Sequence, residues 1–324
     1  MRILLKKLAR LFGGHECIGM PARERVLPND INEVCNGGYP PLDGLASGSG
    51  EAQERQRQAV AEVGLPLEVK AAKSEIVFRL IPPGTFTMGD EDYGEHQVTL
   101  TKLFYCGKFP VTQGQWQAVM DNNPSYFKDA GREAPVERVS WRDCQAFLNK
   151  LCRMEGAADG TYRLLTEAEW ECACRAGSTS AFCFGDNDSA LDEYGWYDGN
   201  GGDSTHPVGQ KRANAFGLYD MHGNVWEWCQ DWYDAYTGES LADPLGPPCG
   251  YDRVNRGGSW RSHAWGCRSA LRFRCTPGHR DHFLGLRLGR ITASYAKGFW
   301  ARVTARAVKH VAGLGVQGGV APPS

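Results

Sequence analysis

The 324-residue sequence has no apolar run long enough to cross a membrane. The longest uncharged apolar stretch near its start is residues 3–5, whereas a membrane span needs roughly 18 apolar residues. Arg2, Lys6, Lys7 and Arg10 interrupt the first twelve positions, so the apolar core of a secretory signal peptide is missing as well. We therefore expect a cytoplasmic protein without a transmembrane segment.

The sequence also lacks a recognisable zinc-binding spacing, although it contains twelve cysteines. Cys172 and Cys174 are too close together for a zinc knuckle, and no second pair follows at ligand distance. A large chain without an export signal normally keeps its thiols reduced. We expect most of these cysteines to be buried as small hydrophobic side chains.

Glycine and tryptophan are abundant, with 40 and 10 residues respectively. Glycine thus makes up about 12% of the chain, against the roughly 7% of average proteins. The remaining composition, 42% hydrophobic and 23% charged, is that of a globular protein. Such a composition predicts many loops and turns held by aromatic packing.

The net charge of −2 hides an uneven distribution. Thirteen Lys and Arg residues but only two Asp lie between Asp252 and His310, which gives this stretch a local charge of +11. A basic stretch of this kind can bind nucleic acid. The alternative, which we favour, is that several of these arginines pair with carboxylates from the acidic remainder.

We expect the chain to have three parts. Residues 1–65 form an N-terminal leader and linker, residues 66–290 a single domain and residues 291–324 a basic C-terminal tail. Residues 1–12 place apolar side chains on one helical face and basic ones opposite, which fits a membrane surface or a groove on a partner. Docking of this helix on its own protein is the alternative.

Within residues 66–290 both strand and helix patterns occur. Strands are predicted at 76–81, 85–89 and 97–104. Helices are predicted at 112–120, 140–154 and 166–175, where Thr or Ser stands at each N-terminus, and a short polar helix is predicted before them at 51–63. Few helical patterns follow residue 177, so we expect an α+β domain with much irregular structure.

Several motifs occur in a fixed order along this domain. They are Met88-Gly89, Pro110-Val-Thr112, Pro135-Val136, Val139-Ser-Trp141, the segment 162–170, the segment 214–221, Gly223-Asn-Val-Trp-Glu-Trp228, Arg256-Gly-Gly-Ser-Trp260 and Gly285-Leu-Arg287. Together they resemble the formylglycine-generating enzyme, or sulfatase-modifying factor, family over about residues 67–288. The resemblance implies an elaborated C-type-lectin-like fold.

The resemblance also implies a calcium site. Family members bind calcium through the segment that matches Asp220, Gly223, Val225 and Glu227, where carboxylates and backbone carbonyls supply oxygen ligands. Trp226 and Trp228 flank Glu227 as a strand requires if the aromatic rings face the core and the carboxylate points the other way. The alternative is that Glu227 pairs with an arginine of the domain.

The copper chemistry of the oxidase members is not expected here. Those members bind copper(I) through two cysteines whose matching positions are Ser262 and Cys267, and a hydroxyl does not replace a thiolate for this soft metal. Another branch binds non-heme iron through histidines. The histidines available here, His263, His279, His282 and His310, show no recognisable iron-binding spacing.

Residues 260–288 resemble, instead, the variable region of proteins diversified by retroelements, which share the lectin-like fold. The resemblance implies that adenines in AAC codons of a template are mutated, which yields fifteen amino acids and never Lys, Glu, Gln, Met or Trp. The twelve expected variable positions all belong to this set: Arg261, Ser262, His263, Gly266, Leu271, Phe273, Cys275, Gly278, His279, Asp281, His282 and Phe283. Trp265 lies outside the set and would be framework or derive from another codon.

We therefore favour a display protein that binds an unknown protein or other macromolecule through these positions. Its aromatic and adaptable polar side chains are typical of a contact surface. A catalytically altered member of the family, including a formylglycine-generating oxidase, and a purely structural member are the alternatives.

Overall fold

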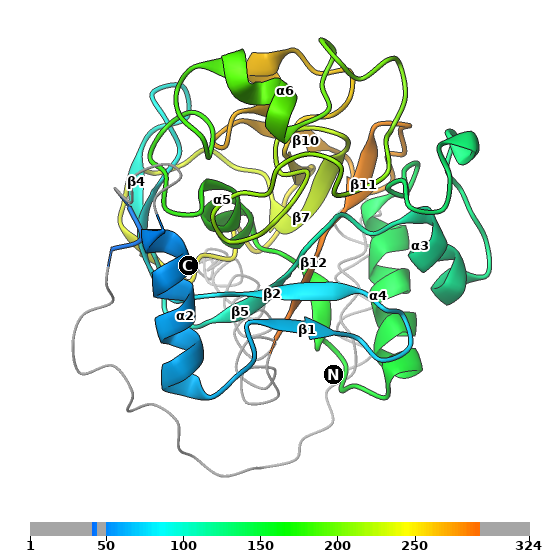
Figure 1. Ribbon diagram of the computed structural model, residues 1–324, viewed down its shortest axis with the longest axis horizontal. Helices are drawn as coiled ribbons and strands as arrows, with labels where there is room; N and C mark the ends of the chain where they lie inside the picture. Colours follow the sequence, from blue (N-terminus) through cyan, green and yellow to red (C-terminus); the bar gives the residue numbers. More distant parts are fainter. Residues whose placement is uncertain (1–40, 44–49, 292–324) are drawn as a thin grey trace, which may run out of the picture. The chain divides into compact units, whose positions relative to one another are not determined.

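The computed structural model describes residues 41–43 and 50–291, and these form an α+β domain with three β-sheets (Figure 1). The α+β prediction is confirmed. The predicted helix at 1–12 and the basic tail after residue 291 lie outside the described residues. No helix in the described ranges has the length and apolar character of a membrane span.

The largest sheet has five strands, all antiparallel to their neighbours, in the order β1-β2-β5-β12-β6. Its strands are β1 (Glu68–Lys70), β2 (Val77–Ile81), β5 (Phe104–Gly107), β12 (Leu288–Arg290) and β6 (Tyr162–Leu164). β12 joins the centre of the sheet although it comes last in the described chain. The end of the proposed variable segment is therefore fixed in the core of the domain.

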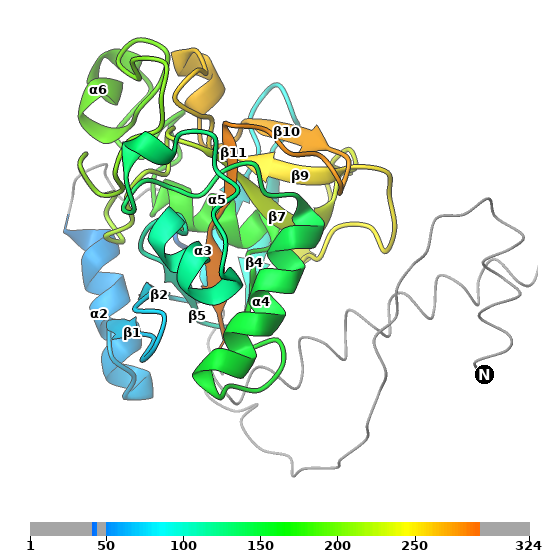
Figure 2. The ribbon, with the colours of Figure 1, turned by 90° about the vertical axis from the view of Figure 1, so that its right-hand side faces the viewer.

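A second sheet, of order β10-β9-β7-β11, contains two strands of that segment, β10 and β11 (Figure 2). Its strands are β7 (Trp226–Trp232), β9 (Arg253–Arg256), β10 (Arg272–Cys275) and β11 (Leu284–Leu286). β9 is antiparallel to both neighbours, whereas β11 runs parallel to β7. The third sheet, β3-β4-β8, consists of β3 (Gly84–Met88), β4 (His96–Leu100) and β8 (Leu241–Ala242).

The helices begin where the sequence predicts. Capping boxes at Thr112, Ser140 and Thr166 start α3 (Gln113–Met120), α4 (Trp141–Glu155) and α5 (Glu167–Arg175). The other helices are α2 (Glu51–Val63) and α6 (Leu191–Tyr194), with short 3₁₀ turns η1 (Lys128–Ala130), η2 (Asp188–Ala190) and η3 (Ala264–Cys267). α3 and α4 pack together beside the largest sheet (Figure 1).

The part of the predicted leader that the structure describes packs against the domain. α2, which lies within the predicted leader, packs on β2. The buried Gln56 side chain donates from Nε2 to the carbonyl oxygens of Leu80 at 2.6 Å and Phe216 at 3.2 Å. Leu42 is also buried in the core. The polar composition of α2 does not indicate these contacts, because one glutamine and a few small side chains make them.

One strand prediction needs correction. The predicted strand at 97–104 is divided between β4 and β5, because the backbone and hydroxyl of Thr101 donate instead to Asp243. The strand expected around Glu227 is present within β7 (Trp226–Trp232), and both of its faces are buried at this point. Glu227 is as buried as Trp228.

The cysteines behave largely as predicted. Eight of the ten that lie in the described ranges are buried. Cys144 and Cys152 belong to the buried stripe of α4 that the sequence indicates, together with Phe147, whose ring stacks on Trp116 at 4.9 Å. These thiols therefore serve the packing of the core.

Gly258, the second glycine of the Arg256-Gly-Gly-Ser-Trp260 motif, lies in a position with little room for a side chain. Its φ is +75°, and an added Cβ would lie 2.5 Å from Sγ of Cys267. We predict that Gly258→Ala lowers the free energy of unfolding by about 3 kcal/mol or more, through backbone strain and overpacking. The matched change is Gly278→Ala, where a Cβ meets nothing within 4 Å. It should cost at most about 0.5 kcal/mol in urea unfolding, and equal effects of the two changes would contradict this packing.

Candidate ligand-binding face

The twelve predicted variable positions are distributed mainly over the surface of the β10 and β11 region. Ten are at least partly exposed: Arg261, His263, Phe273 and Gly278 are exposed, and Ser262, Cys275, His279, Asp281, His282 and Phe283 are partly exposed. We call these ten residues the variable face. They come from the loop between β9 and η3, from β10 and from the turn before β11, so one continuous segment supplies them all.

The other two positions, Leu271 and Gly266, are buried, so their expected exposure was wrong. Leu271 is only 6% exposed and belongs to the same core cluster as Trp226. Gly266 lies within η3, where an added Cβ would stand 3.2 Å from Cβ of Ser262. Trp265, by contrast, is 61% exposed, although its residue type lies outside the permitted set.

Buried arginines hold the backbone of this segment in place. Arg256 donates to the carbonyl oxygens of Ser269, Ala270 and Leu271 at 2.7–3.0 Å and also pairs with Glu171. Burial alone would raise the pKa of Glu171, but the neighbouring guanidinium groups bring it below its ordinary value. Because both partners are fully enclosed, loss of one would leave an uncompensated buried charge.

Further arginines of the basic stretch are paired in the same way. Arg272 donates to both carboxylate oxygens of Glu167, at 2.6 and 2.8 Å. At the edge of the segment, Arg280 makes a similar two-point contact with Asp143. These pairs confirm the structural alternative for the arginines that form them.

An aromatic cluster adjoins the variable face. Trp260, from the Gly-Gly-Ser-Trp motif, meets the ring of Phe127 edge-on at 5.4 Å. His282 lies 5.6 Å from both Trp260 and Tyr126, measured between ring centroids. Tyr126 is 65% exposed. The cluster thus joins the variable face to the loop between α3 and α4.

Glu137 holds the backbone of this loop through hydrogen bonds to its carboxylate. Its fully buried carboxylate accepts hydrogen bonds from the backbone N–H groups of Tyr126 at 3.0 Å and Phe127 at 2.8 Å. Burial raises the pKa of Glu137 to about 7, although these two N–H donors act in the opposite direction. The orientation of two ring-bearing residues therefore depends on one carboxylate.

Sequence reasoning did not identify Tyr126, Phe127 or Glu137 as part of the site. Their loop has no regular hydrophobic period, so a pattern search cannot place it beside residues 260–283. The available signal was its length, since about 14 residues separate α3 from Pro135, and long loops within compact domains are often functional.

The positions that match the copper-binding cysteines do not fit copper(I). Oγ of Ser262 accepts a hydrogen bond from the backbone N–H of Ser259 at 3.0 Å. Cys267 is fully buried, and this burial raises the pKa of its thiol well above the ordinary value. A hydroxyl and an inaccessible thiol do not form the pair of soft thiolates that the metal needs.

Two histidines of the variable face flank Asp281 instead of forming an iron site. His282 Nδ1 lies 2.6 Å from Oδ1 of Asp281, and His279 Nε2 lies 3.6 Å from Oδ2. His263 pairs elsewhere, with Asp198. Among residues 41–43 and 50–291, no three His, Cys, Asp or Glu side chains are grouped so that they could hold a metal ion.

The proposed calcium ligands are also placed in a way that does not fit the ion. Both oxygens of Glu227 are engaged by Arg287, with contacts of 2.8 and 2.9 Å, and one also accepts from Nε1 of Trp170 at 2.6 Å. The guanidinium thus occupies the position at the carboxylate that a cation would need. The ion-pair alternative describes Glu227 in this structure.

The other three proposed calcium positions are equally enclosed. Asp220 accepts from the backbone N–H of Gly209 at 2.8 Å, and burial raises its pKa to about 6. Val225 is buried, and an added Cβ at Gly223 would lie 2.2 Å from the carbonyl oxygen of Trp196. Calcium binding by this set stays an untested prediction that the geometry does not support.

The Glu227–Arg287 pair leads to a direct test. We predict that neither calcium nor a chelator shifts the melting temperature, because Arg287 already engages both oxygens of Glu227 and a ligand stabilises the fold only where it binds. Glu227→Gln should lower the free energy of unfolding by about 3–5 kcal/mol, since Arg287 would remain buried without its counter-charge. A melting temperature that rises with calcium in the parent protein, and not in the variant, would restore the calcium site.

Glu137 predicts a pH dependence. Its folded-state pKa of about 7 exceeds the ordinary 4.5, so the folded protein keeps a proton that the unfolded chain releases. The parent should therefore lose stability relative to Glu137→Gln as pH rises from about 4.5 to 7, by at most about 1.4 kcal/mol per pH unit, with no further change above. Urea unfolding of both proteins at pH 5, 6, 7 and 8 measures this, and a constant difference would contradict the assignment.

This chain is similar in sequence to a known protein family and to several of its members. The sulfatase-modifying factor enzyme 1-like domain family matches residues 67–291. The chaperone protein LppX of Paenibacillus barcinonensis is 34% identical over 231 residues, which cover 56% of this chain and 78% of that protein. The formylglycine-generating enzyme of Bos taurus is 27% identical over 330 residues, or 78% of this chain and 84% of that protein.

Solved structures show the same fold. Variable protein 1 of Treponema denticola is 33% identical with a TM-score of 0.64, and the match covers 69% of this chain and 99% of that one. PvdO of Pseudomonas aeruginosa is 28% identical with a TM-score of 0.61, over 69% and 98% of the two chains. The predicted formylglycine-generating-enzyme-like, C-type-lectin-like fold is therefore confirmed, and the chain belongs to the sulfatase-modifying factor family.

Proposed function

We propose that this protein binds a macromolecular ligand through the variable face, and that this face is diversified while the scaffold stays constant. The observation that carries the proposal is the division of one segment into buried framework and accessible variable positions. Within β10, for example, Arg272 is buried in its pair with Glu167, whereas the adjacent Phe273 is 48% exposed. Side chains at the accessible positions can change without disturbing the pairs beneath them.

The chemistry of the variable face supports a binding role. Phe273 and Phe283 supply apolar ring surface, and the guanidinium of Arg261 lies 5.1 Å from the ring centroid of Phe283. Rigid aromatic residues mixed with adaptable polar ones are typical of engineered and natural paratopes. The likeness to a variable protein supports the same conclusion.

Formylglycine-generating activity is the less favoured alternative. Its support is the membership of the family and the overall likeness to formylglycine-generating enzymes. Against it stand Ser262, which lacks a thiol, and Cys267, whose thiol is enclosed. A cysteine-containing sulfatase-type peptide incubated with the protein and copper should therefore remain unoxidised.

Substitutions at two of the twelve positions test which of them are exposed and which belong to the core. We predict that Phe273→Ser changes the free energy of unfolding by about 1 kcal/mol or less, because nearly half of the side chain is exposed. Leu271→Ser should cost about 3 kcal/mol or more, because it removes a core side chain and buries a hydroxyl. Urea unfolding of both variants decides this, and an equally large cost for Phe273→Ser would make it a framework residue.

Diversification itself is tested at the level of DNA. The proposal predicts an adenine-rich near-copy of codons 260–288 close to the gene, together with a reverse transcriptase gene. Sequencing of the flanking DNA reveals either. Their absence would limit the proposal to ligand binding by a fixed face.

A further inference from the structure

One tryptophan of the variable segment stands apart by its exposure. Of the nine tryptophans within residues 41–43 and 50–291, only Trp265 is exposed, to 61%. Its ring joins none of the hydrophobic clusters of the described chain and makes no ring contact with a described residue. Aromatic side chains stabilise a fold through burial, so this indole contributes little to stability. Tryptophan is, however, enriched among the residues that dominate the affinity of interfaces.

The backbone that carries Trp265 is held in place. Trp265 lies in η3, and its carbonyl oxygen accepts a hydrogen bond from Nε of Arg268 at 3.2 Å. The same guanidinium pairs with Asp90 at 3.1 Å and with Asp92 at 2.7 Å. Residues 89–95, which join β3 to β4, therefore lie beside η3. We call residues 89–95 the acidic loop.

Hydrogen bonds within and beneath the acidic loop order its backbone. Oδ1 of Asp90 accepts from the backbone N–H groups of Asp92 at 3.0 Å and Tyr93 at 3.2 Å. At the start of the loop, the backbone N–H of Gly89 donates to the buried carboxylate of Glu171 at 2.8 Å. The surface that η3 and the acidic loop form is thus ordered before a ligand binds, which lowers the entropic cost of binding.

The acidic loop carries more negative charge than the described chain balances. Asp90 and Asp92 share the single positive charge of Arg268, and the Asp92 side chain is 65% exposed. Glu91 and Glu95 are exposed and form no ion pair with a described residue. The surface beside the indole is therefore electronegative and complementary to a cation.

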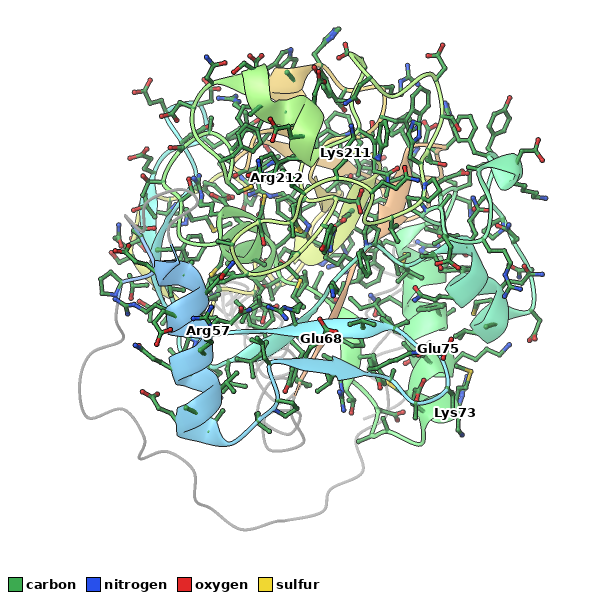
Figure 3. The ribbon with its side chains drawn as sticks, in the orientation of Figure 1. Arg57, Glu68, Lys73, Glu75, Lys211 and Arg212 are labelled. Carbon is green, nitrogen blue, oxygen red and sulfur yellow. The ribbon has the colours of Figure 1, made fainter. Side chains whose placement is uncertain are left out.

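Two basic residues near η3 are bound to α6 instead of the acidic loop. α6 lies beside η3 in both ribbon views (Figures 1 and 2). Lys211 donates from Nζ to the carbonyl oxygen of Asp192 at 2.6 Å, and Arg212 pairs with Glu193 at 2.6 Å (Figure 3). Both acceptors belong to α6. These two cations thus remain with α6, and the acidic loop keeps its charge for a partner.

We propose that Trp265 and the acidic loop bind a lysine- or arginine-containing segment of a protein ligand. The cationic group would lie over the face of the indole, the aromatic ring that attracts cations most strongly. It would pair with the free carboxylates of Glu91 and Glu95. This inference rests on the proposed function, because η3 lies within the segment that is proposed to be diversified.

Diversification would leave this contact unchanged. Tryptophan is outside the residue types that mutated AAC codons encode, and its single codon, TGG, contains no adenine. A template with TGG at this position therefore returns Trp265 in every copy. The variable face would then select the ligand around one constant contact, and a few such residues commonly dominate the affinity of an interface.

The probes for this proposal are three blocked pentapeptides in which glycine alternates with two copies of arginine, citrulline or glutamate. Citrulline has the shape of arginine without its charge. In two-dimensional amide NMR of the full chain, the arginine peptide should shift the indole N–H signal of Trp265, assigned with Trp265→Phe, and the signals of residues 89–95. Saturation should lie in the millimolar range. The citrulline and glutamate peptides should bind at least about threefold more weakly, and the difference should decrease in about 1 M salt.

Variants identify the groups responsible. The double change Glu91→Gln and Glu95→Gln should weaken the arginine peptide at least about threefold, whereas Asp159→Asn, an exposed carboxylate outside the acidic loop, should not. Trp265→Ser should weaken it to a similar extent, read from the signals of residues 89–95. It should leave the melting temperature within about 2 °C of the parent, because the side chain is largely exposed.

Three results would each overturn the proposal. They are equal binding of the arginine and citrulline peptides, no effect of the two glutamine changes, and a melting temperature of Trp265→Ser that falls as far as that of Leu271→Ser. The last result would make Trp265 a structural residue.

The same measurements distinguish this inference from the proposed function. A protein with Phe273, His279 and Phe283 all replaced by serine should still bind the arginine peptide, since none of these residues belongs to η3 or the acidic loop. If the arginine peptide fails to bind while the Phe273→Ser protein remains stable, the constant contact is refuted and the accessible variable face stands. If the peptide binds while Phe273→Ser unfolds the protein, the reverse holds.

Discussion

The hydrogen bonds from Arg256 to three consecutive carbonyl groups are the constraint on which the rest of the structure depends. They fix residues 269–271 at the point where the chain leaves η3 and enters β10. The guanidinium is fully buried, so it requires its counter-charge, Glu171 on α5. Arg272 and Arg287 repeat this arrangement with Glu167 on α5 and Glu227 on β7. Backbone geometry in the variable segment is thus set by side chains that lie beneath it.

This arrangement explains how one segment can combine a constant fold with changeable chemistry. The buried ion pairs, the tight contact of Gly258 with Cys267 and the insertion of β12 into the largest sheet are made by residues that lie before, between and after the accessible positions. None of them uses the side chain of Arg261, Phe273 or Phe283. Binding residues usually lie on loops that a rigid scaffold holds in place. Here, buried framework residues also lie within the variable segment itself.

Much of this fold could be predicted from local signals. Capping boxes mark helix starts because they satisfy backbone donors next to their own position in the chain, and Thr112, Ser140 and Thr166 all behave in this way. The burial of Leu271 and the partner of Glu227 could not be predicted. Both depend on which distant segments meet, and no local period encodes the contact between Glu227 and Arg287, 60 residues later. The same limit concealed Tyr126 and Glu137, whose loop meets the variable face only in three dimensions.

The central claim is that the accessible positions are exchangeable and the framework is not. Its most direct measurement is the protease resistance of a displayed library in which the ten positions of the variable face are randomised together, compared with a library of equal size at ten buried positions of residues 254–288. The account predicts that most members of the first library resist protease as the parent does, whereas few of the second do. Comparable loss of resistance in both libraries would contradict it.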